Sequence, residues 1–206
     1  RAILATHLFG GLADIDALKA IGDRHGIPVI EDCAQAQLAE LADGRLAGTI
    51  GQIGCFSFNN TKHLNCGEGG MVITNDDALA RRARFFADKA WPREEEQRYS
   101  LFLGQNYRLN ELEGAVALVG LRRLDENVAA RRRAVEQIYE RVAGLPGLSI
   151  PETLPGAKSS YWILHFLVDE GIDPGAVAKA LAAEGIPFGA RYVTPLYTWP
   201  VLRDAN

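Results

Sequence analysis

The sequence predicts an α/β fold built on a mostly parallel sheet. Short, almost continuously apolar segments alternate with helical segments through residues 1–144. Strands of this kind are typical of parallel sheets, because helices cover both of their faces. A segment rich in proline and glycine follows at 145–156. We therefore expect a large domain at 1–144, and a linker with the start of a small α+β C-terminal domain at 145–206.

Local signals place the elements of the large domain. Asp14 is the predicted N-cap of a helix that ends at Gly26, and Asn75 or Asp76 caps the next helix, which extends to Lys89. Four short apolar segments are predicted strands, namely residues 2–8, 27–32, 53–58 and 70–74.

A long helical stretch follows the predicted loop at 91–105. Asn110 and Glu113 have the spacing of a capping box, and the helix extends to about Val142 with a break expected near Leu124–Asp125. Beyond the linker, residues 161–169 are a predicted strand, and a helix is expected from Asp173 to Gly185.

Composition limits the possible functions. The chain has 206 residues, 48% hydrophobic and 23% charged, as in a globular protein. The net charge of −4 argues against a nucleic-acid surface or binding to an anionic membrane. Three cysteines without metal-type spacing indicate buried, reduced thiols and a cytoplasmic protein. The chain begins within a strand and stops one helix into the small domain, so we expect a fragment of a longer protein.

Lys62 is placed unusually. Between Leu46 and Asn75 the only charged side chains are Lys62 and Glu68. A lysine in an apolar setting has its charged form disfavoured, and the neutral amine is a nucleophile suited to Schiff-base chemistry. Placement alone favours a simpler alternative, a lysine that extends to solvent or pairs with a distant carboxylate.

Other residues strengthen the chemical interpretation. Asp32 ends an apolar strand, where ligands of open α/β sheets bind, and its carboxylate can pair with a cationic ring nitrogen. Ser57 can offer a hydroxyl to a phosphate, and the glycines at 67–70 let backbone approach a ligand closely. Each feature is weak alone. Together they are the parts that a pyridoxal 5'-phosphate (PLP) site requires.

Four stretches carry a family resemblance, and they occur in the order HLFGGLADIDAL, VIEDCAQA, GCFSFNNTKHLNCGEGGMVITND and GQNYRLNELEGAVALVGLRRLD. They resemble the DegT/DnrJ/StrS family of PLP-dependent sugar aminotransferases, over essentially the whole chain. The resemblance implies the PLP-transferase fold type I of aspartate aminotransferase. It also implies a family N-terminal segment and C-terminal end that are absent here, so this fragment is not expected to be a competent enzyme by itself.

The resemblance implies a role for each site residue. Lys62 would form the internal aldimine with PLP and then move the substrate proton. Asp32 would keep the pyridine nitrogen protonated, Gln35 would lie at the cofactor face, and Ser57 would bind the phosphate. Asn106 would reach the cofactor phosphate of a neighbouring subunit, which implies a homodimer with a shared active site.

Further positions follow from the same resemblance. His7 is interpreted as a structural residue or one that supports the site. Tyr107 and Arg108 are expected to hold their loop rather than to touch substrate. The pair Gln37-Leu38 departs from the family pattern on the substrate side, and residues 87–95 are candidates for lining the substrate site.

Three functions remain in view. The first is ping-pong aminotransfer from glutamate or glutamine to a keto-sugar, often nucleotide-linked, or a keto-cyclitol, as in polysaccharide or antibiotic biosynthesis. The second is PLP-type sugar dehydration, in which family members replace the lysine with histidine; here His63 follows Lys62. The third is a regulatory or scaffold descendant without PLP, against which the intact site residues argue. The sequence leaves the sugar or cyclitol and the reacting carbon open.

Overall fold

The computed structural model describes residues 1–93, 96 and 99–204, and the chain divides into two compact units. The larger unit contains residues 1–140 and 152–165, and the smaller unit contains 141–151 and the residues from 166 onward. The chain therefore passes between the units three times. The division at 144/145 expected from sequence falls inside 141–151, the first stretch of the smaller unit, and it stays a prediction.

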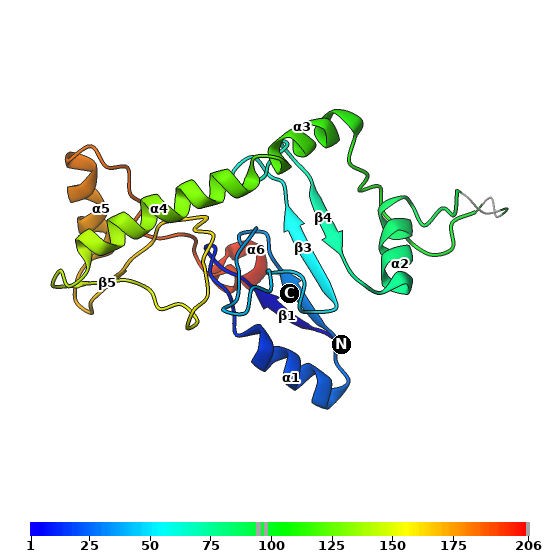
Figure 1. Ribbon diagram of the computed structural model, residues 1–206, viewed down its shortest axis with the longest axis horizontal. Coiled ribbons are helices and arrows are strands. Elements are labelled where there is room, and N and C mark those ends of the chain that lie inside the picture. The colour runs from blue at the N-terminus through cyan, green and yellow to red at the C-terminus, as the bar shows by residue number, and fades with distance from the viewer. Residues whose placement is uncertain (94–95, 97–98, 205–206) are drawn as a thin grey trace. The chain divides into compact units, whose positions relative to one another are not determined.

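A four-stranded sheet forms the centre of the larger unit (Figure 1). Its strands, in spatial order, are β1 (Ile3–Thr6), β2 (Val29–Asp32), β3 (Ile53–Ser57) and β4 (Gly70–Ile73). The pairs β1–β2 and β2–β3 are parallel, and β4 is antiparallel to β3. The predicted mostly parallel sheet is confirmed.

Four helices accompany this sheet: α1 (Ile15–His25), α2 (Asp77–Ala87), α3 (Glu111–Leu121) and α4 (Leu124–Val142), whose last residues enter the smaller unit. Their ends follow the predicted signals. The Asp14 side chain accepts a hydrogen bond from the first turn of α1, and Gly26 ends that helix in the left-handed conformation at φ 62°. Asn110 and Glu113 form the expected capping box of α3, and the expected break separates α3 from α4.

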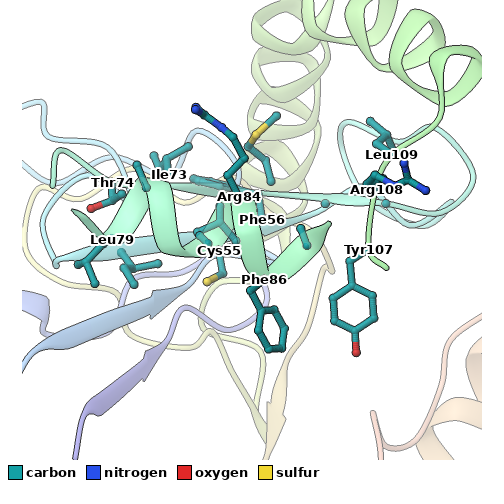
Figure 2. Close-up of a pocket in the computed structure, with 18 of the residues that line it drawn as sticks. Cys55, Phe56, Ile73, Thr74, Leu79, Arg84, Phe86, Tyr107, Arg108 and Leu109 are labelled. Atoms are coloured by element: carbon teal, nitrogen blue, oxygen red, sulfur yellow. The ribbon is translucent and has the colours of Figure 1, made fainter. Parts of the chain in front are cut away.

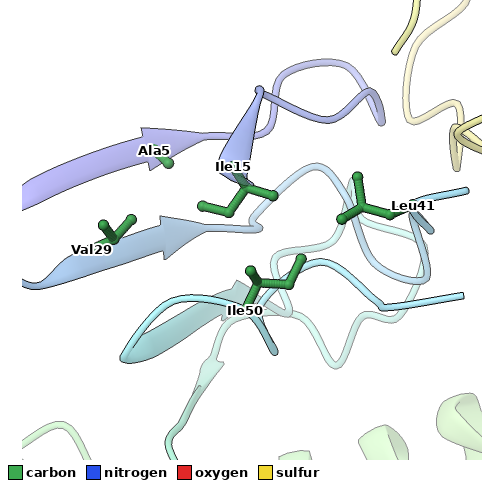
Figure 3. Packing of buried hydrophobic residues seen from close by; sticks show 5 residues of the cluster. All are labelled: Ala5, Ile15, Val29, Leu41 and Ile50. Carbon is green, nitrogen blue, oxygen red and sulfur yellow. The ribbon is translucent and has the colours of Figure 1, made fainter. Parts of the chain in front are cut away.

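An apolar core joins α1 to the sheet. Ile15, which has no exposed surface, packs with Ala5 of β1, Val29 of β2, Leu41 and Ile50 (Figure 3). Burial of an isoleucine side chain contributes about 1.5–3 kcal/mol. Because this cluster includes residues of β1 and β2, it fixes these two strands relative to α1 and so positions the loops that follow them.

The smaller unit contains a two-stranded antiparallel ladder and short helices. Its elements are β5 (Leu148–Ser149), β6 (Leu167–Val168), α5 (Pro174–Ala183), the 3-10 helix η1 (Leu196–Thr198) and α6 (Pro200–Arg203). The strand predicted over 161–169 is wrong for residues 161–166. Tyr161 adopts φ 48°, a left-handed conformation that interrupts an extended strand.

Two expectations about chemistry can be compared with the fold. Cys33, Cys55 and Cys66 are unpaired thiols, as predicted; Cys33 and Cys66 are buried as expected, and Cys55 is half-buried. Among the residues that the structure describes, no helix combines the length and the apolar character needed to cross a bilayer.

A buried carboxylate in β2 connects three parts of the larger unit. Glu31 has no exposed surface and accepts hydrogen bonds from the backbone N–H groups of Gly48 (2.8 Å), Ile50 (2.8 Å) and Gly51 (2.6 Å). The imidazole of His7, which follows β1, donates a fourth bond from Nε2 at 2.9 Å. Burial alone would raise the pKa of Glu31, but the bonds from His7 and these amides together hold it below the usual value.

Replacing this carboxylate tests its structural role. Glu31→Gln is expected to lower the free energy of unfolding by about 3–5 kcal/mol, because an amide NH₂ would oppose backbone N–H donors in a buried site. Urea denaturation measures the change, and Glu152→Gln, at an exposed position, is the matched control. A loss no larger than that of the control would contradict the role.

The same comparison has a pH dependence. The pKa of folded Glu31 is depressed, so the stability from its ionised form is complete above the ordinary value of 4.5 and is lost as the pH falls through the lower folded pKa. The Glu31→Gln variant should lack this part of the acid destabilisation.

Candidate active site

The carboxyl ends of β2 and β3 bring two predicted site residues together. Asp32 is the last residue of β2, and it lies opposite Cys55 in the parallel register of β3. Ser57 ends β3 two residues later. Lys62 follows Ser57 in the loop after β3, in a turn closed by a hydrogen bond from its backbone N–H to the Asn59 carbonyl at 3.0 Å. The site residues therefore occupy the edge where open α/β sheets bind ligands.

Polar side chains hold the loop that carries Lys62. Gln37 is buried; its Oε1 accepts the Leu64 N–H at 2.6 Å, and its Nε2 donates to the Ser57 carbonyl at 2.8 Å. The loop is thus fixed at both of its ends. Gln37, a departure from the family pattern, therefore acts here as a support for backbone. Sequence reasoning missed this, because its partners are backbone groups 20 and 27 residues away.

Lys62 is half-buried, and two opposing effects act on the pKa of its amine. Burial lowers the pKa of the amine, and the negative charge of Asp32 opposes that shift. The ammonium lies over the Trp162 ring, 3.9 Å from the ring centroid. In the described parts of the chain Lys62 forms no salt bridge. The lysine is therefore near a carboxylate without being neutralised by a direct ion pair.

Asp32 and Ser57 retain unused hydrogen-bonding capacity. Among the residues that the structure describes, the Asp32 carboxylate accepts one hydrogen bond, from the Ala34 N–H at 3.1 Å. The Ser57 hydroxyl oxygen accepts a long bond from the Asn59 N–H at 3.3 Å, and its hydrogen has no acceptor within the described residues. A carboxylate ready to accept a ring N–H and a hydroxyl ready to donate to a phosphate fit PLP.

The other two predicted site residues have different surroundings. Gln35 Oε1 accepts the Phe9 N–H at 2.8 Å. Asn106 is exposed, and its Oδ1 accepts a bond from Arg108 Nε at 2.9 Å. Within the described ranges, Asn106 makes no hydrogen bond to the residues at the ends of β2 and β3.

Tyr107 and Arg108 hold the segment that contains Asn106. The Tyr107 N–H bonds to the Ala87 carbonyl at 2.8 Å, and Arg108 Nε lies 3.5 Å from Asp88. These contacts agree with their expected loop-holding role. Of the candidate segment 87–95, Glu94 and Glu95 lie outside the described residues.

His7 has a supporting position rather than a reactive one. Its Nδ1 accepts the Ala13 N–H at 3.1 Å, so the ring hydrogen is on Nε2, which donates to Glu31. Donor atoms of His7, Glu31 and Cys33 lie within 4.8 Å of one another. Both imidazole nitrogens are already hydrogen-bonded to groups of the chain, and burial raises the pKa of the Cys33 thiol.

A separate apolar hollow of about 1210 Å³ lies between β4, α2 and the segment 107–109 (Figure 2). Its lining includes Cys55, Met71, Val72, Phe86 and Leu109. None of the five predicted site residues lines it. The size of this hollow therefore says nothing about the space around Lys62.

Comparison with known proteins now gives the family. The sequence profile of the DegT/DnrJ/EryC1/StrS aminotransferase family matches residues 1–206. The chain belongs to this family. It is 40% identical to the L-glutamine:2-deoxy-scyllo-inosose aminotransferase of Streptoalloteichus tenebrarius, over 96% of this chain and 50% of the relative. It is 33% identical to the putative pyridoxal phosphate-dependent aminotransferase EpsN of Bacillus subtilis, over 100% of this chain and 52% of EpsN.

A solved structure shows the same fold. DesV of S. venezuelae, crystallised in complex with a ketimine intermediate, superposes with a TM-score of 0.87 at 33% identity, over 100% of this chain and 54% of DesV. The PLP-transferase fold type I inferred from the motifs is therefore confirmed. The chain spans about half the length of the relatives that it matches.

His63 provides a pH test of how the Lys62 loop is anchored. Its Nε2 donates to the Ser160 carbonyl at 2.9 Å, and burial lowers its pKa from 6.5 to about 4. The unfolded chain thus binds a proton more readily, so stability should fall by up to about 3 kcal/mol as the pH drops from 6.5 to 4.

His63→Gln retains a donor in the place of Nε2 and removes this titration. Chemical denaturation of both proteins between pH 7 and pH 4 should show a difference that narrows as the pH falls. Parallel curves would mean that His63 is not buried in its neutral form.

Proposed function

We propose that the protein carrying this chain is a PLP-dependent aminotransferase acting on a keto-sugar, often nucleotide-linked, or a keto-cyclitol, with glutamate or glutamine as amino donor. The observation that carries the proposal is the position of Lys62. It is a half-buried amine with a lowered pKa, within the field of Asp32, at the carboxyl ends of β2 and β3. The names of the relatives support the reaction and the class of acceptor.

Bound PLP would supply an electron sink for the substrate carbon. Lys62 would provide the nucleophilic amine that holds the cofactor, and afterwards it would move the proton at the reacting carbon. Asp32 would accept the hydrogen of the pyridine nitrogen and so keep that nitrogen protonated. Ser57 would donate its hydroxyl to the phosphate. Gln35 would border the cofactor face, held in place through its bond to Phe9.

The proposed active unit is a homodimer in which Asn106 serves the site of the other subunit. Asn106 is exposed, and α3 follows it closely in the chain. That helix exposes the apolar side chains Leu112 (80%), Val116 (54%) and Val119 (57%). Exposed apolar surface of this kind is typical of faces that another polypeptide covers. We also propose a cytoplasmic location, which the reduced cysteines support.

The geometry argues against the alternative of dehydration. The lysine is retained, and the neighbouring His63 points into a buried hydrogen bond with the Ser160 carbonyl, so it does not occupy the place of Lys62. A scaffold without PLP would have no need for the open donor and acceptor groups of Ser57 and Asp32.

Borohydride reduction with PLP tests the assignment of Lys62 in the complete protein. We expect a pyridoxyl group on Lys62 by peptide mass mapping, and none on the exposed Lys179, because only Lys62 combines a pKa lowered by burial with a position next to the proposed cofactor site. Lys62→Ala should lose the adduct and transamination together. An adduct spread over surface lysines would defeat the proposal.

Asp32→Asn is the matched variant in the same experiment. It should keep the adduct on Lys62, since it leaves the amine in place, while transamination falls on the order of 100-fold, the size typical for a positioned acid–base group. Near-normal turnover would remove the pyridine role from Asp32.

Mixing inactive variants tests the shared site. Lys62→Ala and Asn106→Ala subunits, each with little activity at limiting PLP, should together regain about one quarter of the activity, because random pairing gives half heterodimers with one intact site each. Each variant refolded alone is the control. Absence of any gain on mixing would place Asn106 at its own subunit's site or at none.

A further inference from the structure

A segment distant in sequence returns to the loop that carries Lys62. Residues 152–165, here called the return segment, belong to the larger unit. The Ser160 N–H bonds to the Gly10 carbonyl at 2.9 Å, and the Trp162 N–H bonds to the Phe9 carbonyl at 3.0 Å. These bonds attach the return segment to the chain that follows β1.

The return segment and the chain after β1 approach each other so closely that the backbone there adopts unusual conformations. A Cβ on Gly10 would lie 2.3 Å from the Tyr161 nitrogen, so only glycine fits there. Phe9 and Tyr161 both adopt left-handed conformations, with φ 57° and φ 48°. Such conformations cost energy outside glycine and persist where the surroundings fix them. The position of Trp162 is therefore closely determined.

Two further bonds attach the return segment on either side of Lys62. The Trp162 indole N–H donates to the Thr61 carbonyl at 2.8 Å, and His63 Nε2 donates to the Ser160 carbonyl at 2.9 Å. Both neighbours of Lys62 in sequence are thus bonded to this segment. The lysine side chain is left to lie across the indole, with Nζ 3.9 Å from the ring centroid.

The contact is selective for one state of the lysine. The face of an indole ring attracts a cation, and tryptophan is the strongest of the aromatic side chains in this respect. A neutral amine, or a nitrogen bonded to another group, gains little from the ring. The ring therefore opposes the effect of burial, which favours the neutral amine.

Trp162 is also connected to a predicted site residue. Phe9 donates its N–H to Gln35 Oε1 at 2.8 Å and accepts the Trp162 N–H at its carbonyl. One backbone residue thus sets the positions of Gln35 and Trp162 together. A shift of the indole would accordingly disturb the side chain expected at the cofactor face.

We propose that Trp162 is a positioning residue that holds the amine of Lys62 over its indole face when the lysine is not bonded to the cofactor and carries a proton. The inference rests on the proposed function, because a transaminase must release its lysine and recapture it in each cycle. Held in this way, the amine stays beside Asp32 instead of extending into solvent. It leaves the ring when its proton passes to solvent, and the neutral amine is then the nucleophile.

The experiment uses the complete protein without cofactor, produced with tryptophan or with mono-, di- or trifluorinated tryptophan. Each fluorine weakens the negative potential of the ring face and leaves the indole N–H in place. The measurement is competitive acylation of lysines at fixed pH with peptide mass mapping. Acylation of Lys62 should rise stepwise, by about 2–5-fold over the series, because a weaker ring releases more neutral amine.

Two controls make this result specific. Lys179 is exposed on α5, and its acylation should not change along the series. Trp162→Phe, prepared with the same fluorinated tryptophans, carries them only at the other tryptophan positions, and its Lys62 acylation should not change either. Acylation of Lys62 that stays constant across fluorination of Trp162 would overturn the inference. If the indole had only a structural role, the electrostatic potential of its ring face would not affect the reactivity of Lys62.

The two proposals fail in different ways. Borohydride trapping of PLP on the non-fluorinated protein reports the proposed function alone. A pyridoxyl group on Lys62 together with constant acylation would leave the function standing and remove the role of Trp162. Absence of the adduct would remove the function, and with it the inference that Trp162 serves a transaminase.

Discussion

The buried carboxylate of Glu31 is the constraint on which the site depends. It occupies β2 directly before Asp32, and its four hydrogen bonds tie the end of β1 and the backbone at 48–51 to that strand. A charge without exposed surface is tolerable only when it is fully bonded in this way. The arrangement leaves little freedom for Asp32, so the acid proposed to face the cofactor is positioned by an acid that does not touch it.

The Lys62 loop shows the same division between reactive and supporting groups. Gln37 and His63 are buried and direct their polar atoms at backbone groups, which fixes the loop without adding charge beside the lysine. Asp32 then acts on Lys62 through its field alone. An uncharged support allows burial to lower the pKa of the amine, and a charged support would have raised or lowered it independently of the cofactor.

The features that could be predicted from the sequence are those that depend on interactions between residues close together in the chain. The cap at Asp14, the glycine at 26 and the Asn110 capping box act within a few residues, and all three were predictable. The uncharged setting of Lys62 is also local. The roles of Glu31, Gln37 and Trp162 depend on partners far along the chain, so no short pattern reveals them.

The same reason accounts for the strand predicted at 161–166, where contacts with Phe9 and Gly10 override an apolar, strand-like sequence.

The chain's three crossings between its units also bear on how such a protein can evolve. A single recombination point after residue 140 would exchange the smaller unit and the return segment together, and would bring a foreign residue to the position of Trp162. Exchange of the smaller unit alone would require further junctions on both sides of 152–165. Because the chain follows this path, the return segment beside Lys62 and the smaller unit are most simply inherited together.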